Sequence, residues 1–270
     1  MKSVLLHVQD DAGLDNRLQA ALSIVRATAG HLNCLHVTPT FQYVNSDGVG
    51  GMFVMQNLTE KFLEYGAQMQ ARIEAQLTNE DVSWNYEEIS GDPTSVLVSR
   101  SSLADLIIMG RYHSSDDSYS PISTMGDVLR SARTPILVQP EDLGTFDPFG
   151  VALVAWNGSF EAANALRAAM PMLKYASDVH IVTVEEPKDH LLPSLDASTY
   201  LSRHGITSEL HTKSASNVTV DHILLTTAEI VDAKYLVMGG YGHSRAREFL
   251  FGGVTRSLLK AFPIPLIMAR

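Results

Sequence analysis

Short apolar runs alternate along the chain with longer amphipathic stretches. Runs such as Leu106-Ile107-Ile108-Met109 are apolar without alternation, which is typical of parallel strands buried on both faces. The pattern therefore predicts successive β-α-β units. The expected strands are 3–9, 32–38, 82–89, 105–110, 135–139, 150–156, 179–185, 207–212, 234–239 and 264–269, and the expected helices are 12–29, 57–79, 93–103, 124–132, 160–176, 194–204, 217–232 and 253–261.

The chain contains two copies of one unit. Residues 105–115 and 234–244 share Met, Gly, Tyr and Ser in register, and similar matches relate 4–9 to 152–157 and 131–138 to 261–268. The fold class predicted is α/β, with two tandem Rossmann-like domains over 1–143 and 148–270. Each domain is expected to be a five-stranded parallel sheet with helices on both faces. Residues 39–56 are expected to be irregular, as a surface loop or, alternatively, a lid or partner contact.

Composition narrows the class of protein. The 270 residues are 45% apolar and 19% charged, so the chain can bury a core. Residues 1–147 carry 9 basic and 19 acidic side chains (9 − 19 = −10), and the remainder carries 11 of each, which sums to the chain's −10. The acidic first half argues against a nucleic-acid partner, and the neutral second half is the better host for an anion.

Targeting and redox signals are few. No run of eighteen apolar residues and no signal-peptide core exist, so no membrane partner and a cytoplasmic location are expected. The single cysteine, Cys34, excludes an intramolecular disulfide and a cysteine-based zinc site, and its apolar surroundings predict a buried hydrophobe.

A ligand is expected where the first and fourth strands of a copy end, because ligands of open parallel sheets bind where the strand order reverses. In the second copy, Gly252-Gly253 stand where the last helix begins, and its free N–H groups favour a phosphate. Thr255 adds a hydroxyl. The alternative is that these glycines only allow tight packing. In the first copy, Ile122-Ser123 replace the glycines and Asp116-Asp117 repel an anion, so that copy is expected to be a structural partner.

This glycine loop resembles that of the universal stress protein family in its tandem two-domain form. The family's pattern is Gly, two residues, Gly, nine residues, Gly, then Ser or Thr; Gly239, Gly242 and Gly252 match it, followed by Gly253. The resemblance covers both halves and implies an adenine nucleotide alpha hydrolase-like fold. It also implies that the last strands of the two halves pair within the chain as a pseudo-dimer, while a further homodimer stays open.

The resemblance implies an adenine nucleotide, ATP or AMP, with Mg²⁺ accompanying ATP. Asn157 stands at the family's Asp that contacts adenosine, and Val184 at the Val that contacts adenine; Gln9 and Val37 are their counterparts in the first copy. The loop glycines would cradle ribose and phosphates. The full candidate set is Trp156, Asn157, Val184, Met238, Gly239, Gly242, His243, Gly252, Gly253, Val254 and Thr255.

Catalytic signatures are missing from the sequence. No Walker loop, HExxH or GxSxG motif occurs, and no catalytic residue or metal site is assigned. His7, His36 and His180 alternate into apolar strands and are expected to be structural, and Asp11 is expected to cap the helix after it. Three functions stay open: a stress-response protein that binds a nucleotide in its second domain, a slow Mg²⁺-dependent ATPase with Glu185 or Glu186, and a nucleotide-free scaffold.

Overall fold

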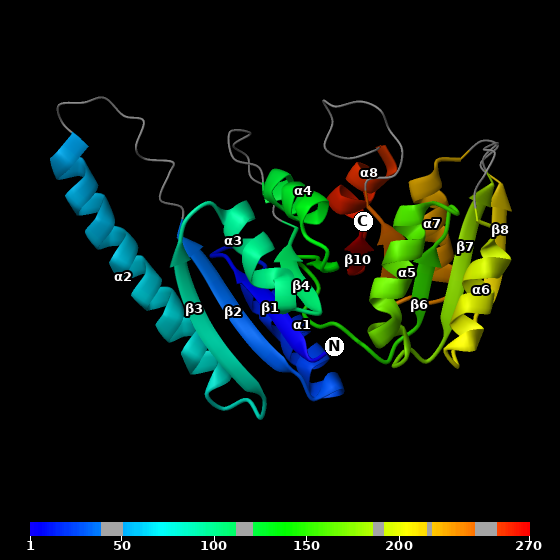
Figure 1. Ribbon diagram of the computed structural model, residues 1–270, viewed down its shortest axis with the longest axis horizontal. Helices are drawn as coiled ribbons and strands as arrows, with labels where there is room; N and C mark the ends of the chain where they lie inside the picture. The colour runs from blue at the N-terminus through cyan, green and yellow to red at the C-terminus, as the bar shows by residue number, and fades with distance from the viewer. Residues whose placement is uncertain (39–50, 112–120, 186–191, 215–217, 241–252) are drawn as a thin grey trace.

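The computed structural model describes residues 1–38, 51–111, 121–185, 192–214, 218–240 and 253–270. Their strands form one sheet with helices on both faces, in the order β3-β2-β1-β4-β5-β10-β9-β6-β7-β8 (Figure 1). The strands are β1 (Ser3–Val8), β2 (His31–Thr38), β3 (Ser83–Ser90), β4 (Leu106–Gly110), β5 (Ile136–Gln139), β6 (Ala152–Ala155), β7 (Val179–Glu185), β8 (Glu209–Ser214), β9 (Tyr235–Gly239) and β10 (Leu266–Ala269).

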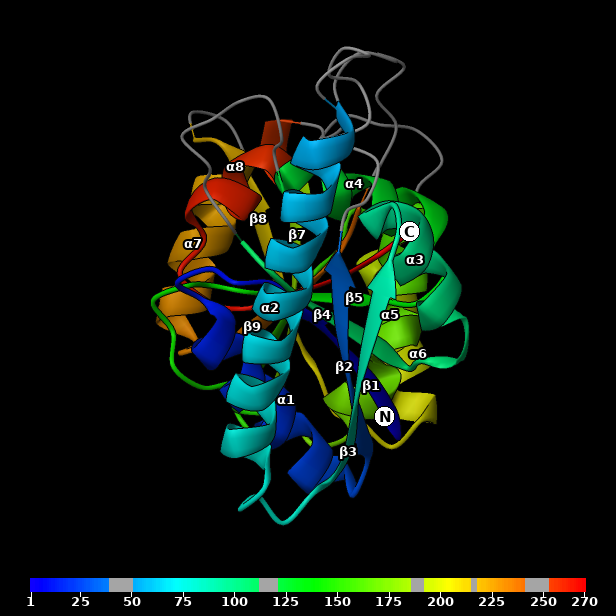
Figure 2. The ribbon, with the colours of Figure 1, turned by 90° about the vertical axis from the view of Figure 1, so that its left-hand side faces the viewer.

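The helices follow the strands as the repeat predicts. They are α1 (Leu14–Thr28), α2 (Gly51–Leu77), α3 (Pro93–Arg100) with a 3₁₀ turn (Ser101–Leu103), α4 (Pro121–Ser131), α5 (Phe160–Leu173), α6 (Ser194–Arg203), α7 (Val220–Ile230) and α8 (Gly253–Ala261). Figure 2 shows the long helix α2 lying along the strands of the first half. Helix α2 begins at Gly51, so the irregular stretch expected over 39–56 is wrong for residues 51–56. Residues 52–63 contain neither glycine nor proline, which lets the helix extend. Residues 39–50 lie outside the described residues.

Each half has the same strand order. β1 lies between β2 and β4, β6 lies between β7 and β9, and all pairings within a half are parallel. The order therefore reverses between the first and fourth strands of each half, as the sequence predicts. The α/β fold with two tandem Rossmann-like halves is confirmed, and the domain boundaries at 143 and 148 stay a prediction.

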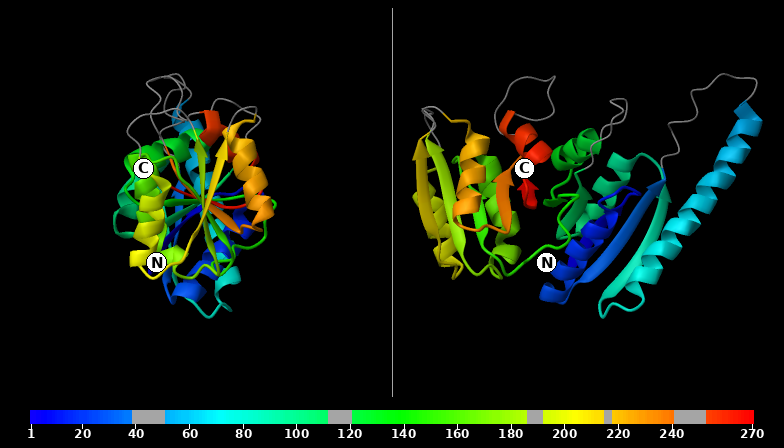
Figure 3. Two further views of the ribbon diagram at one scale, coloured as in Figure 1. Left: turned by 90° about the vertical axis from the view of Figure 1, so that its right-hand side faces the viewer. Right: turned by 180° about the vertical axis from the view of Figure 1, so that it is seen from behind.

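The two halves join through their last strands. β5 and β10 pair antiparallel, with Leu137 opposite Ile267, both fully buried. The Arg111 Nη1 donates to the Phe262 carbonyl oxygen at 2.6 Å, which adds a hydrogen bond across the junction. Figure 3 shows the halves side by side, with the C-terminus in the middle of the molecule. The pairing of last strands that the resemblance implied is confirmed.

The core forms two layers because side chains alternate across each strand. Leu6 and Ile108 face the layer that contains residues of α1, α2, α5 and α6, whereas Leu5 and Ile107 face residues of α3, α4, α7 and α8. Cys34 is fully buried in the first layer, and burial raises the pKa of its thiol to about 12. The prediction that Cys34 is a buried hydrophobe is confirmed. Among the described helices, none combines the length and apolar character needed to cross a membrane.

The antiparallel junction predicts energetic coupling between Leu137 and Ile267. Replacing either residue by Ala should lower the free energy of unfolding by about 2–5 kcal/mol, because each change leaves a core cavity. The two losses should deviate from additivity by at least about 0.5 kcal/mol, since the residues are direct cross-strand neighbours. Urea denaturation of the single and double variants measures this. As a control, Leu137→Ala with Leu201→Ala, which lies beyond β9 and β6, should be additive.

Candidate functional site

The second-half edge comprises the carboxyl ends of β6, β7 and β9 and the start of α8. Because β6 pairs in parallel with both neighbours, the three strand ends meet at one edge of the sheet. They bring Trp156, Val184 and Gly239 to this edge. Gly242, His243 and Gly252 lie outside the described residues, as do Asp116 and Asp117 of the first half.

Trp156 and Asn157 are both engaged by neighbouring chain. The Trp156 ring is buried, and its Nε1 donates to the Leu192 carbonyl oxygen at 2.9 Å. The exposed Asn157 accepts hydrogen bonds at Oδ1 from the Ser159 N–H at 3.2 Å and the Ser159 hydroxyl at 2.7 Å. Gly158 has φ 71°, a left-handed conformation suited to glycine. Asn157 therefore closes a turn ahead of α5, while its side-chain N–H groups extend from an exposed residue.

The start of α5 is capped by Ser159 and packed against Gly239. Ser159 Oγ accepts the Ala162 N–H at 3.2 Å and caps the helix. A Cβ on Gly239 would lie 2.6 Å from the Glu161 carbonyl carbon and 2.7 Å from the Ala162 nitrogen. Gly239 is thus required for close packing of β9 against α5. Met238, just before it, is buried, and Val184 on β7 is half-buried.

The start of α8 has space on the side of the described residues. Gly253 is exposed, and a Cβ built on it would meet no atom of the described residues within 4 Å. Val254 is half-buried and Thr255 is buried, so the helix is anchored by its first turn. The Ser257 hydroxyl donates to Asp221, which ties α8 to α7. Tight packing therefore explains Gly239 but not Gly253.

A cleft lies at the equivalent edge of the first half. This first-half cleft has a volume of about 200 Å³, and the ends of β1, β2 and β4 contribute to its lining. Its polar lining residues are His7, Gln9, Asp10, His36, Tyr65 and Thr124. Val37, the counterpart of Val184, also lines it. The sequence did not predict a cleft here, because the first-half loop lacks the paired glycines that predict a phosphate site in the second half.

A buried ion pair fills the space beneath this cleft. Arg17 Nη1 lies 2.7 Å from Asp11 Oδ1 with both side chains 1% exposed, and Nη2 donates to the Gln9 carbonyl oxygen at 2.9 Å. A Cβ on Gly110 would lie 2.3 Å from Arg17 Nη1. The expectation that Asp11 caps α1 is wrong: the N-cap is Gly13, whose N–H donates to Asp11 at 2.9 Å. Asp11 is instead committed to the buried guanidinium.

The two histidines of the cleft are neutral. Burial, followed by the charge of Arg17 and by His36, lowers the pKa of His7 to about 3. Burial also lowers the pKa of His36, against the opposing effects of Glu88 and Asp10. Neither ring then offers positive charge to an anion at neutral pH.

Several solved structures share this fold over nearly the full length of the chain. A universal stress protein from Archaeoglobus fulgidus DSM 4304 is 20% identical with a TM-score of 0.71, and the match covers 99% of this chain and 96% of that one. A putative universal stress protein from Pseudomonas aeruginosa UCBPP-PA14 is 18% identical with a TM-score of 0.60, covering 100% and 93%. A functionally unknown protein from Pseudomonas aeruginosa PAO1 is 17% identical with a TM-score of 0.60, covering 100% and 92%.

These full-length matches show that the chain has the universal stress protein fold in its tandem form. The sequence itself matches no protein-family model and no curated protein.

The two glycines of the second-half edge should differ in stability. Gly239→Ala should lower the free energy of unfolding by about 1–3 kcal/mol, because the added methyl group meets the backbone of α5. Gly253→Ala should change it by less than about 0.5 kcal/mol, since the methyl group meets no atom of the described residues within 4 Å. Urea denaturation distinguishes them. Equal losses would contradict the packing role of Gly239.

The neutral His7 predicts a loss of stability in acid. The pKa of His7 is lower in the folded than in the unfolded state. Its contribution to the free energy of unfolding is therefore complete above about pH 6.5 and is lost as the pH falls toward 3. The loss should approach about 1.4 kcal/mol per pH unit in that window, and His36 shifts in the same direction. Between pH 7 and pH 4.5, His7→Gln should remove about 2–3 kcal/mol of the acid loss measured by urea denaturation. The exposed control His204→Gln should not.

Proposed function

We propose that this chain is a tandem universal stress protein that binds one adenine nucleotide, ATP or AMP, at its second-half edge. The observation that carries this proposal is the start of α8 at Gly253, where a new Cβ would meet no described atom within 4 Å, in the half whose strand order reverses between β6 and β9. A helix start without a Cβ in its way lets backbone N–H groups approach a phosphate, and the helix dipole favours the anion.

The remaining residues of the second-half edge suit the other parts of a nucleotide. Val184 offers an apolar half-buried surface at the end of β7 for adenine, and Asn157 offers side-chain N–H donors for the ribose or base. Thr255 and Val254 support the first turn of α8. Gly242, His243 and Gly252 complete the proposed phosphate loop. Mg²⁺ would accompany ATP, and Glu185 and Glu186, which directly follow Val184 in the sequence, are the carboxylates proposed to lie near it.

The geometry also supports one site per chain. The first-half cleft, at about 200 Å³, is smaller than the roughly 300–1,000 Å³ of ordinary ligand pockets. Asp10 lines it, its histidines are neutral, and its described lining includes neither lysine nor arginine. Of the cations described beside it, Arg17 is already paired with Asp11, and Arg72 is paired with Asp10 and Asp15. The first half therefore acts as the structural partner of the second.

Binding without turnover is the proposed mode, and the protein acts through its conformation or its partners. A second candidate, a nucleotide-free scaffold, is favoured by the engagement of Asn157 Oδ1 with Ser159. A slow Mg²⁺-dependent ATPase would use the same site. The cytoplasmic location and a further homodimer stay predictions.

Calorimetric titration with ATP and with AMP, each with and without Mg²⁺, tests the proposal. The full chain should bind one nucleotide. Gly253→Val should weaken binding at least tenfold, about 1.4 kcal/mol, because its side chain occupies the space open to a phosphate. The matched control is Gly144→Val, at an exposed glycine between the two halves, where the new Cβ would lie 3.8 Å from Asn16 Oδ1.

The outcomes separate the three candidates. Loss of affinity in Gly253→Val, with unchanged affinity in Gly144→Val and an unchanged urea midpoint, supports the site. If the chain releases phosphate from ATP, and does so only with Mg²⁺, the protein is the slow ATPase and binding without turnover is wrong. Absence of binding, with no nucleotide copurified by mass spectrometry, would overturn the nucleotide proposal and leave the scaffold.

A further inference from the structure

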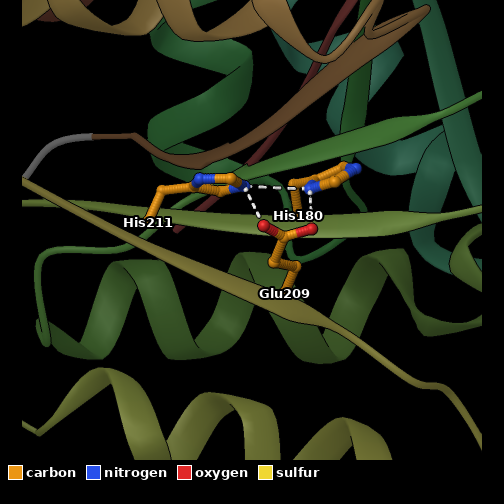
Figure 4. Close-up of side chains that lie close together, drawn as sticks. All are labelled: His180, Glu209 and His211. Atoms are coloured by element: carbon orange, nitrogen blue, oxygen red, sulfur yellow. Dashed lines mark hydrogen bonds and ion pairs between the residues drawn. The ribbon is translucent and has the colours of Figure 1, made fainter.

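A cluster of side chains that can ligate a metal ion lies away from the second-half edge, on strands β7 and β8. His180 is opposite Glu209 in the parallel register of these strands, and Val182 is opposite His211. Glu209 and His211 are two residues apart on β8, so their side chains share a face of the sheet. His180 lies beside Glu209 on that same face. Figure 4 shows the three side chains converging.

The distances among the three side chains are close to those of ligands around a single ion. His180 Nδ1 and His211 Nε2 are 2.9 Å apart, His180 Nδ1 is 3.6 Å from Glu209 Oε2, and His211 Nε2 is 3.9 Å from Glu209 Oε1. With metal–ligand bonds of about 2.0–2.2 Å, neighbouring ligand atoms lie roughly 2.9–3.5 Å apart. Small side-chain rotations would bring the carboxylate into that range.

The exposure of the three side chains also fits a metal site with an open position. The His180 and His211 side chains are 16% and 18% exposed, so the protein restricts their rings, whereas Glu209 is 67% exposed. Water can therefore reach the cluster from the side of the carboxylate. Three protein ligands with water completing the coordination is a common arrangement for zinc.

The hydrogen bond between the two rings does not argue against a metal. Two neutral imidazoles whose nitrogens face each other share one proton between two lone pairs. When the ring that holds this proton carries it on its other nitrogen instead, both facing nitrogens present lone pairs to a divalent cation while both imidazoles stay neutral, and the adjacent carboxylate balances part of the cation's charge. A purely structural histidine pair would not require a carboxylate within 4 Å of both facing nitrogens.

We propose that His180, Glu209 and His211 form a binding site for a divalent transition-metal ion of the Zn²⁺ class. Imidazole nitrogens select such ions over Mg²⁺ and Ca²⁺, which prefer all-oxygen ligands. The site is independent of the proposed nucleotide site, because His180 and Val184 are four residues apart on β7, about 13 Å along the strand. A bound ion would tie the outer strand β8 to β7.

Zinc titration of the full chain, monitored by competition with a chromogenic chelator after EDTA treatment, tests this proposal. One Zn²⁺ should bind per chain, and Mg²⁺ should not compete. His211→Ala and Glu209→Gln should each weaken binding at least about tenfold, since even the loss of outer-shell partners costs ten- to hundredfold. The matched control His204→Ala removes an exposed histidine outside the cluster and should bind like the unaltered chain.

Two further measurements keep the result decisive. Glu209→Gln alters an exposed side chain, so its urea midpoint in EDTA should equal that of the unaltered chain. Zn²⁺ should raise the melting temperature of the unaltered chain and of His204→Ala, but not that of the His211→Ala/Glu209→Gln double variant. Equal zinc affinity in this double variant and in the unaltered chain, or no zinc binding at all, would overturn the site.

Discussion

The antiparallel pairing of β5 with β10 is the constraint on which the rest of the molecule depends. Each half alone would end in an apolar strand with unpaired N–H and C=O groups, which is an unstable edge. Joining the two edges buries Leu137 against Ile267 and turns both into inner strands of one sheet. Within each half, the parallel pairings align the carboxyl ends of the strands, so that each half has its own reversal point, one at β1/β4 and one at β6/β9.

The two reversal points have diverged in what occupies them. In the first half, the Arg17 side chain lies against Gly110 and is neutralised by Asp11, so a buried ion pair takes the space. In the second half, the corresponding glycine, Gly239, admits the backbone of α5 instead. A buried ion pair needs both partners, because an uncompensated charge in the interior is costly. This difference agrees with the proposal that the second half alone binds a nucleotide.

Much of the fold could be predicted because its signals are local. Uninterrupted apolar runs such as Leu106 to Met109 mark buried strands, and the recurrence of Met-Gly after the fourth strand marks the repeat. The site was less predictable, because a glycine's role depends on what lies opposite it. Their spacing does not distinguish the two glycines, whereas the structure places Gly239 against the backbone of α5 and leaves no described atom within 4 Å of a Cβ on Gly253. Arg17 and Asp11 have no motif, and only burial reveals their pairing.

The cluster around His180 could not be predicted from the sequence either. His180 is a lone histidine in an apolar strand, and its partner His211 follows 31 residues later. Register alone brings them together, since β7 and β8 are parallel neighbours. The position has a physical logic. β3 and β8 are the outermost strands of the described sheet; α2 packs against β3 and α6 packs against β8, and β8 carries exposed polar residues such as Glu209 and Lys213. Charged side chains protect such an edge from pairing with other chains. A cation shared between β7 and β8 would add a side-chain link to the backbone pairing of these strands without making the edge apolar.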